Sequence, residues 1–133
     1  MENELKVVDI FIGTTLRGSA KGSGRAMYIM RTKRKNGSDY EAAPQIVEYD
    51  DTTESESVLR AIRDALQRLH YACTVVIHTE CSYVASAITQ HWPEKWQRNG
   101  WKSAKGNPVK NAVLWEMLLQ DVEDGGHIPV SYT

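Results

Sequence analysis

The sequence predicts an α/β domain built on a five-stranded mixed sheet with helices on both faces. Residues 5–50 contain three runs in which side chains alternate with a period of two, as in antiparallel strands. Residues 52–70 change to a helical period. Residues 72–78 form a short, continuous run of apolar and β-branched side chains, which is typical of a central strand covered on both faces.

The first three strands are expected at residues 5–12, 25–33 and 39–50. Asn36-Gly37, between the second and third strands, has typical hairpin-turn chemistry. These strands should therefore form an antiparallel meander.

The glycine-rich stretch GTTLRGSAKGSG (residues 13–24) follows the first strand. Gly13 and Gly18 have the spacing of a phosphate-binding loop, but that motif requires Lys and then Ser or Thr after the second glycine. Ser19 and Ala20 stand there instead, and a strand follows rather than a helix. A long hairpin turn is the better interpretation.

The first helix is expected at residues 52–70, where Val58 and Ile62 belong to an apolar stripe. Thr53 followed by Glu56 fits a capping box at its start.

The second helix is expected at residues 81–92, where Pro93 interrupts it. A loop at 99–108 then leads to a third helix at 108–126, and residues 127–133 form a last short strand.

Composition predicts one domain, residues 1–133, of an ordinary globular protein, with 41% hydrophobic and 25% charged residues. No apolar run approaches the roughly 20 residues of a membrane span, and the N-terminus lacks the layout of a signal peptide. A cytoplasmic protein without membrane contact is expected. Cys73 and Cys81 lack metal-ligand spacing and are expected to be buried free thiols.

The positive charges are segregated. Residues 14–35 hold seven Lys or Arg and no acid, and residues 91–110 hold five, with Glu94 as their one acid. This pattern suits a protein that offers a polyanion one attractive face. The alternative is that the two segments lie on different faces as solvated surface.

Glu80 closes the central strand, and open α/β sheets bind ligands at the carboxyl ends of their strands. It is therefore a candidate site residue. The alternative is a carboxylate that only benefits from the dipole of the helix that follows.

Residues 78–118 contain four short motifs, which are Thr79-Glu80-Cys81-Ser82-Tyr83-Val84, Gly100-Trp101-Lys102, Pro108-Val109-Lys110-Asn111 and Leu114-Trp115. In these motifs the segment closely resembles ribonuclease H, type 1, which shows T-D-S-x-Y-V, G-W-K, P-V-K-N and L-W. Weaker similarity at residues 8–15 and 51–59 and the order of the elements extend the resemblance. It implies the ribonuclease H fold up to its last strand, with the family's C-terminal helix missing.

The resemblance also implies a degenerate active site. Ribonuclease H cuts the RNA strand of an RNA–DNA hybrid with two divalent metal ions, for which the family supplies four carboxylates. Gly13 and Val58 stand at the first two of these positions, Glu80 at the third, and the fourth lies beyond the last strand. Glu80 is therefore the one expected catalytic and metal-binding remnant, and Mg²⁺ or Mn²⁺ should bind weakly.

Two other acids are candidates to replace the missing carboxylates. Asp9 is four residues from Gly13 along the strand, which is about 13 Å and too far to share a metal. Glu54 is about 6 Å along the helix axis from Val58, so it would approach Glu80 if the helix start shifted.

Binding features match the family better than catalytic ones. Thr53 and Asn111 match residues that hold a phosphate of the DNA strand, although Glu56 replaces the arginine that assists them. The family's basic handle corresponds to Trp92, Trp96 and Trp101 among Lys95, Arg98, Lys102, Lys105 and Lys110. Rings and cations together suit sugar and phosphate contacts. The alternative for the tryptophans is packing, which is favoured for Trp115.

The leading hypothesis is a protein that binds a nucleic-acid duplex, RNA–DNA hybrid or double-stranded RNA, without efficient cleavage. A working Mg²⁺- or Mn²⁺-dependent endoribonuclease is the second. The third is a protein-interaction module with an apolar patch. A missing last helix would leave part of the sheet uncovered, so a homodimer is possible.

Overall fold

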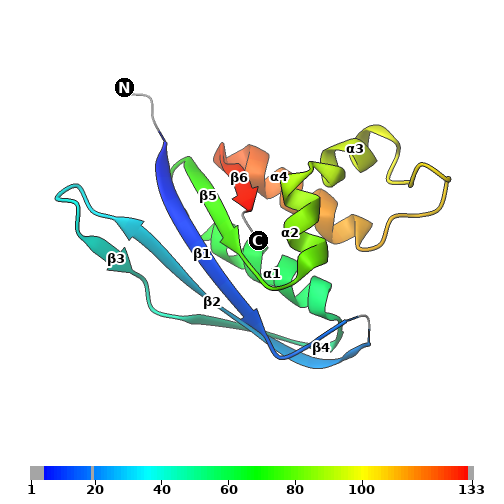
Figure 1. Ribbon diagram of the computed structural model, residues 1–133, viewed down its shortest axis with the longest axis horizontal. Coiled ribbons are helices and arrows are strands. Elements are labelled where there is room, and N and C mark those ends of the chain that lie inside the picture. The colour runs from blue at the N-terminus through cyan, green and yellow to red at the C-terminus, as the bar shows by residue number, and fades with distance from the viewer. Residues whose placement is uncertain (1–4, 19, 132–133) are drawn as a thin grey trace.

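The computed structural model describes residues 5–18 and 20–131 (Figure 1). This part of the chain forms ten elements, which are β1 (Lys6–Thr14), β2 (Gly22–Lys33), β3 (Asp39–Glu41), β4 (Gln45–Thr52), α1 (Glu54–Gln67), β5 (Cys73–His78), α2 (Ser82–Thr89), α3 (Trp92–Arg98), α4 (Ala112–Gly125) and β6 (Ile128–Ser131). No helix in these ranges is long and apolar enough to cross a membrane.

The strands form one mixed sheet in the order β3-β2-β1-β5-β6, and β4 also pairs with β2. The pairs of β2 with β1, β3 and β4 are antiparallel. Those of β5 with β1 and β6 are parallel. The predicted mixed sheet, with an antiparallel first part and a central strand at residues 73–78, is therefore confirmed.

The predicted third strand, residues 39–50, is divided into β3 and β4, which gives six strands instead of five. Both parts lie on the same edge of β2. The break falls at Pro44, whose ring nitrogen has no hydrogen to donate to the ladder.

Helix α1 begins where the sequence predicts. The Thr53 hydroxyl accepts a hydrogen bond from the Glu56 N–H, and the Glu56 side chain accepts one from the Thr53 N–H, which completes a capping box. The buried face of α1 packs on β1, β2 and β4, where Ile10 and Tyr28 are almost fully buried. Burying a side chain such as Ile10 stabilises the fold by roughly 1.5–3 kcal/mol.

The second half contains one more helix than predicted. Helix α2 ends at Thr89, His91 adopts a left-handed conformation with φ of 59°, and α3 follows. Pro93 lies in the first turn of α3, where its missing N–H has no helical partner, so it begins a helix as well as ending one. Helix α4 begins at Ala112 rather than at Pro108, because Pro108 pairs with Lys102 across the base of the intervening loop.

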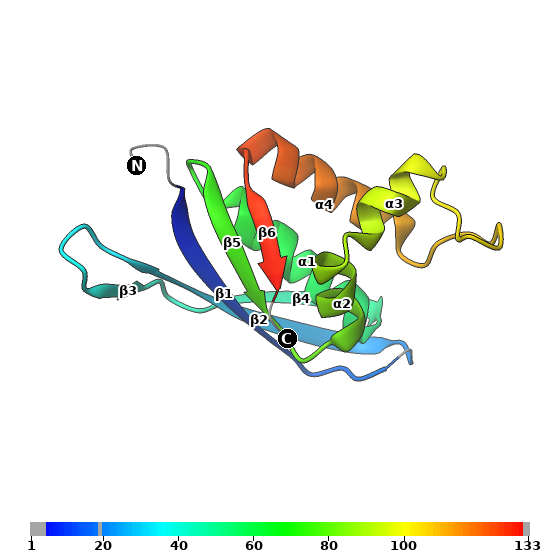
Figure 2. The same ribbon diagram turned by 45° about the horizontal axis from the view of Figure 1, so that its top comes forward.

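One face of the first strands stays open, unlike the prediction of helices on both faces. The described helices α1 and α4 lie on the same side of the sheet, and α2 packs against β6 (Figure 2). On the other side Val7, Met27 and Ile46 are exposed. Alternate side chains of a strand point to opposite faces, so these residues alternate with buried or partly buried residues along each strand.

Candidate functional site

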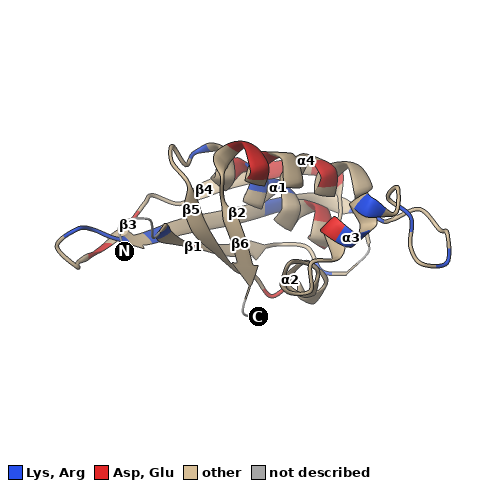
Figure 3. Ribbon diagram, turned by 90° about the horizontal axis from the view of Figure 1, so that it is seen from above, with Lys and Arg blue, Asp and Glu red and all other residues tan. Residues whose placement is uncertain are grey.

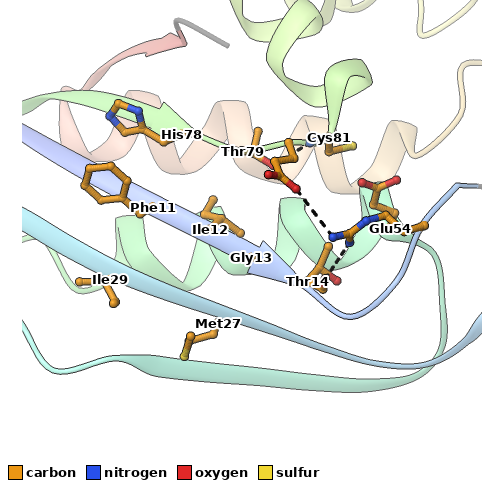
Figure 4. A pocket seen from close by; sticks show the side chains of 12 residues that line it. Phe11, Ile12, Gly13, Thr14, Met27, Ile29, Glu54, His78, Thr79 and Cys81 are labelled. Atoms are coloured by element: carbon orange, nitrogen blue, oxygen red, sulfur yellow. Dashed lines mark hydrogen bonds and ion pairs between the residues drawn. The ribbon is translucent and has the colours of Figure 1, made fainter.

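A pocket of about 490 Å³ lies at the carboxyl ends of β1 and β5 (Figure 4). Its lining comprises Phe11, Ile12, Gly13, Thr14, Arg17, Met27, Ile29, Glu54, His78, Thr79, Glu80 and Cys81. Two parallel neighbouring strands end here, which is where open α/β sheets bind ligands. The sequence-based expectation that Glu80 lies at this edge of the sheet is borne out by its position.

Glu80 projects into solvent at the turn that follows β5. The Thr79 hydroxyl accepts a hydrogen bond from the Cys81 N–H at 3.1 Å, and this local turn leaves the Glu80 side chain 89% exposed. Arg17 Nη2 lies 3.8 Å from Glu80 Oε1, and the Arg17 side chain is 64% exposed. Solvent screens such a pair, so the contact contributes little to stability.

Glu54 lines the same pocket from the first turn of α1. Its Oε1 accepts a hydrogen bond of 2.8 Å from the Gly18 N–H of the β1–β2 loop. Asp9 does not line the pocket, although its Oδ1 is 2.8 Å from Nε2 of His78, which does. Glu54 therefore lines the pocket together with Glu80, and Asp9 does not.

The other two positions of the expected metal site hold no ligand. Gly13 pairs with Met27 near the end of β1, and a Cβ built on Gly13 meets no atom within 4 Å. Val58 has 0% exposure and belongs to the core beneath α1. Among the described residues, no group of three or more His, Cys, Asp or Glu lies close enough to hold a metal ion. The residues present therefore do not fit a pair of divalent cations.

The buried cysteines do not supply ligands either. Burial raises the pKa of the Cys81 thiol, and of the Cys73 thiol, above its ordinary value. A thiol must lose its proton to bind a metal, so both are neutral structural groups near neutral pH.

Thr53 and Asn111 are brought together through a residue that sequence reasoning missed. Asn111 Nδ2 donates to Ser55 Oγ at 3.0 Å, and Ser55 Oγ lies 3.4 Å from Thr53 Oγ1. Ser55 is two residues beyond the predicted N-cap, and that position was a usable signal. Thr53 is only 4% exposed, and its N–H donates a hydrogen bond to the Glu56 carboxylate. The cluster of Thr53, Ser55 and Asn111 is therefore poorly accessible to a ligand at Thr53 and has a negative charge beside it.

The tryptophans of the handle pack against the body of the protein. Trp92, Trp96 and Trp101 are partly buried against the hydrophobic core. The Trp96 ring lies edge to face with the fully buried Trp115 ring, with 6.2 Å between centroids. These three rings therefore pack against the core, as the alternative interpretation states, and part of each ring remains exposed.

Five cations of the handle are exposed. They are Lys95, Arg98, Lys102, Lys105 and Lys110. None of them forms an ion pair with another residue in the described ranges. We define residues 92–110 as the basic handle. It occupies one end of the molecule, around α3 and the loop that follows (Figure 3).

The first basic segment, residues 14–35, does not form one continuous surface with the basic handle. Arg25, Arg31 and Lys33 pair with Glu48, Glu41 and Asp39, respectively. The hairpin between β2 and β3 lies at the opposite end of the molecule from α3 (Figure 3). The hairpin part of this segment therefore lies apart from the basic handle, as the alternative of two separate basic surfaces states.

Comparison with known proteins gives a consistent result. Residues 9–132 match the family model for RNase H. The chain is 35% identical over 115 residues to the ribonuclease H of Oleidesulfovibrio alaskensis, an alignment that covers 86% of this chain and 70% of that protein. It is 31% identical over 121 residues to the ribonuclease H of Thermoanaerobacter sp., with 90% and 73% covered.

Solved structures share the fold. A foamy viral protease-reverse transcriptase in complex with RNA/DNA hybrid gives a TM-score of 0.71 at 16% identity, covering 97% of this chain and 17% of that chain. The solution structure of the PFV RNase H domain gives 0.68 at 13% identity, covering 99% and 81%. The expected ribonuclease H fold is thus confirmed, and with the match over residues 9–132 the chain belongs to the RNase H family.

Proposed function

We propose that this protein binds a nucleic-acid duplex, RNA–DNA hybrid or double-stranded RNA, through the basic handle and does not cleave it efficiently. The observation that carries the proposal is the set of five exposed handle cations without an ion-pair partner among the described residues. Cations that no protein carboxylate neutralises remain available to phosphates. The foamy viral structure with bound RNA/DNA hybrid shares this fold, which supports the same class of partner.

The electrostatics of the pocket support impaired cleavage. Two divalent ions placed about 4 Å apart need several carboxylates to offset their repulsion. Here Glu80 faces Arg17, Glu54 is bonded to Gly18, and Gly13 and Val58 have no ligand atoms in their side chains. We propose that Mg²⁺ or Mn²⁺ binds weakly, at millimolar concentration or above.

The test is a fluorescence-anisotropy titration of labelled hybrid, double-stranded RNA and double-stranded DNA over a salt series. Lys102→Ala with Lys105→Ala is expected to weaken binding and to reduce the slope of log affinity against log salt by about 2. The matched control is Lys35→Ala on the distant hairpin, which should leave the slope unchanged. Absence of salt-sensitive affinity for every duplex would reject the proposal.

A working hydrolase is the second candidate, because Glu54 and Glu80 line one pocket and the curated relatives carry the name ribonuclease H. It requires Mn²⁺-supported cutting of labelled hybrid that Glu80→Gln abolishes. Cutting that survives Glu80→Gln would point to a contaminant.

A protein-interaction module is the third candidate, and the exposed apolar residues of the open sheet face favour it. It predicts a homodimer whose mass is independent of nucleic acid. Light scattering across a concentration series would measure this, and Met27→Lys with Ile46→Lys should return the protein to a monomer.

A further inference from the structure

We propose that the guanidinium of Arg17 stands in for a metal ion in the pocket and binds a backbone phosphate of the duplex there. This inference rests on the proposed duplex binding and adds the group that meets the phosphate. It concerns the β1–β2 loop, which the sequence predicts only as a turn.

The guanidinium is fixed on one side by the backbone. Arg17 Nη1 donates to the carbonyl oxygens of Thr14 and Leu16, each at 2.7 Å. The loop itself is tied to α1, because the Gly18 N–H donates to Glu54 and Thr14 Oγ1 lies 3.0 Å from Ser57 Oγ. The side chain is therefore held in place before any ligand arrives, which reduces the entropy lost on binding.

Among the described residues, no hydrogen bond occupies the opposite edge of the guanidinium. Its Nε–H and Nη2–H groups form the planar fork that matches two phosphate oxygens. The contact on this edge is Nη2 to Glu80 Oε1 at 3.8 Å, which is too long for a hydrogen bond. Because Glu80 is 89% exposed, its carboxylate can move aside at little cost when a phosphate approaches.

The charges in the pocket favour this cation over a metal. A divalent ion on Glu80 would lie beside a fixed guanidinium, and like charges a few ångströms apart repel each other. For a phosphate the signs are reversed. Glu80 and Glu54 would repel it, and the attraction of Arg17 offsets part of that repulsion. Arg17 therefore makes the pocket tolerate a phosphate without a metal.

The pocket also connects to the basic handle. A neighbouring hollow of about 290 Å³ is lined by Gly18, Glu54 and Glu80 from the pocket side and by Lys110 from the handle side. A strand that follows the handle cations therefore reaches Arg17 next, which gives one line of phosphate contacts.

The first experiment measures duplex affinity by anisotropy over a salt series, with EDTA present and absent. Arg17→Ala is expected to weaken binding and reduce the salt slope by about 1, and Arg17→Lys should restore the slope but only part of the affinity, because lysine lacks the fork. EDTA should change nothing. Arg34→Ala, on the distant hairpin, is the matched control and should retain the wild-type slope.

The second experiment needs no nucleic acid. Mn²⁺ at about 1 mM is added to ¹⁵N-labelled protein, and broadening of the Glu80 and Cys81 amide signals is followed. We expect little broadening in the wild type, clear broadening in Arg17→Ala, and its loss in the double variant Arg17→Ala with Glu80→Gln.

The outcomes separate the two proposals. Wild-type binding that Arg17→Ala leaves unchanged in affinity and slope overturns the role of Arg17 and keeps the proposed function. A wild type that binds no duplex rejects the proposed function and the phosphate contact together. Strong broadening of the Glu80 and Cys81 signals by Mn²⁺ in the wild type would overturn the proposal that Arg17 replaces the metal ion, whatever the duplex measurements give.

Discussion

At the scale of single residues, Gly13 and Val58 occupy the two positions where the pocket lacks the carboxylates of a metal site. The two positions differ in how well the fold would tolerate a carboxylate. Gly13 lies at the exposed end of β1, and a Cβ built there meets no atom within 4 Å. Val58 has 0% exposure beneath α1. A carboxylate can therefore be added at the first position without disturbing the fold, whereas the second would bury a charge in the core.

Gly13→Asp is accordingly expected to change the free energy of unfolding by less than about 1 kcal/mol, because it replaces a glycine with another poor strand former. Val58→Glu should cost several kcal/mol, since the buried residues in the described part of the chain include no Lys or Arg to pair with the new carboxylate. Urea unfolding of the two variants measures this difference. Equal stability of the two would contradict the burial of Val58.

Gly13→Asp should also strengthen Mn²⁺ binding, because it adds a second carboxylate to the pocket that holds Glu80. Calorimetric titration with Mn²⁺ would measure the gain. The paired variant Gly13→Asn, which adds an amide of the same size without charge, should gain much less.

Residue identity in the site was only partly predictable. Glu80 could be placed because it lies two residues after an apolar run that is typical of a central strand. Arg17 could not, because its contacts depend on the path of a glycine-rich loop whose turn geometry no periodicity encodes. Ser55 was overlooked although its position in the first turn of α1 brings it next to Thr53.

At the scale of elements, the side-chain cap of α1 made its start predictable, whereas the starts of α3 and α4, which lack such a cap, were missed. Thr53 and Glu56 mark the start of α1 through a capping box. Helices α3 and α4 instead follow His91 and Asn111 in left-handed conformations with no side-chain cap bond. Such residues leave no clear mark in a sequence, and Pro93 marks a start and a stop equally well.

The cap of α1 is testable. Thr53→Ala removes the hydroxyl that accepts from the Glu56 N–H, and it should lower the free energy of unfolding by about 1 kcal/mol. Thr53→Ser keeps the hydroxyl and should lose much less. Ser82→Ala, at the exposed first turn of α2, is the control in chemical denaturation. A loss as large for Thr53→Ser as for Thr53→Ala would show that the methyl group, not the cap, matters.

At the scale of the whole molecule, the charge pattern of the sequence was informative about one surface and misleading about the other. The basic handle is an exposed cluster at one end of the molecule (Figure 3), whereas the hairpin cations Arg31 and Lys33 are paired with Glu41 and Asp39. Strand pairing brings Arg31 opposite Glu41, a cross-strand contact that counting charges along the chain overlooks. Charge runs therefore indicate a binding surface only after the acids facing them are known.

The fold as a whole should lose stability in alkaline solution. Burial raises the pKa of the Cys73, Cys81 and Tyr83 groups, and burial with a 2.6 Å hydrogen bond to Asp64 raises that of Tyr28. All four are neutral when protonated, so the unfolded chain releases their protons at lower pH than the folded chain does. Stability is then fully present below the unfolded-state values and falls as pH rises through the folded-state ones.

Urea unfolding between pH 7 and pH 10.5 should therefore show a declining free energy from about pH 8.5, where free thiols begin to ionise. Cys81→Ala is expected to flatten the decline while lowering stability at pH 7, because it removes a buried titrating group and leaves a small void. Arg17→Ala, which removes an exposed cation but no thiol or phenol, should show the same decline with pH as the wild type. A wild-type curve that stays level to pH 10.5 would mean that the thiols and phenols titrate alike in the folded and unfolded chain, and the packing around them would have to be much looser than the structure shows.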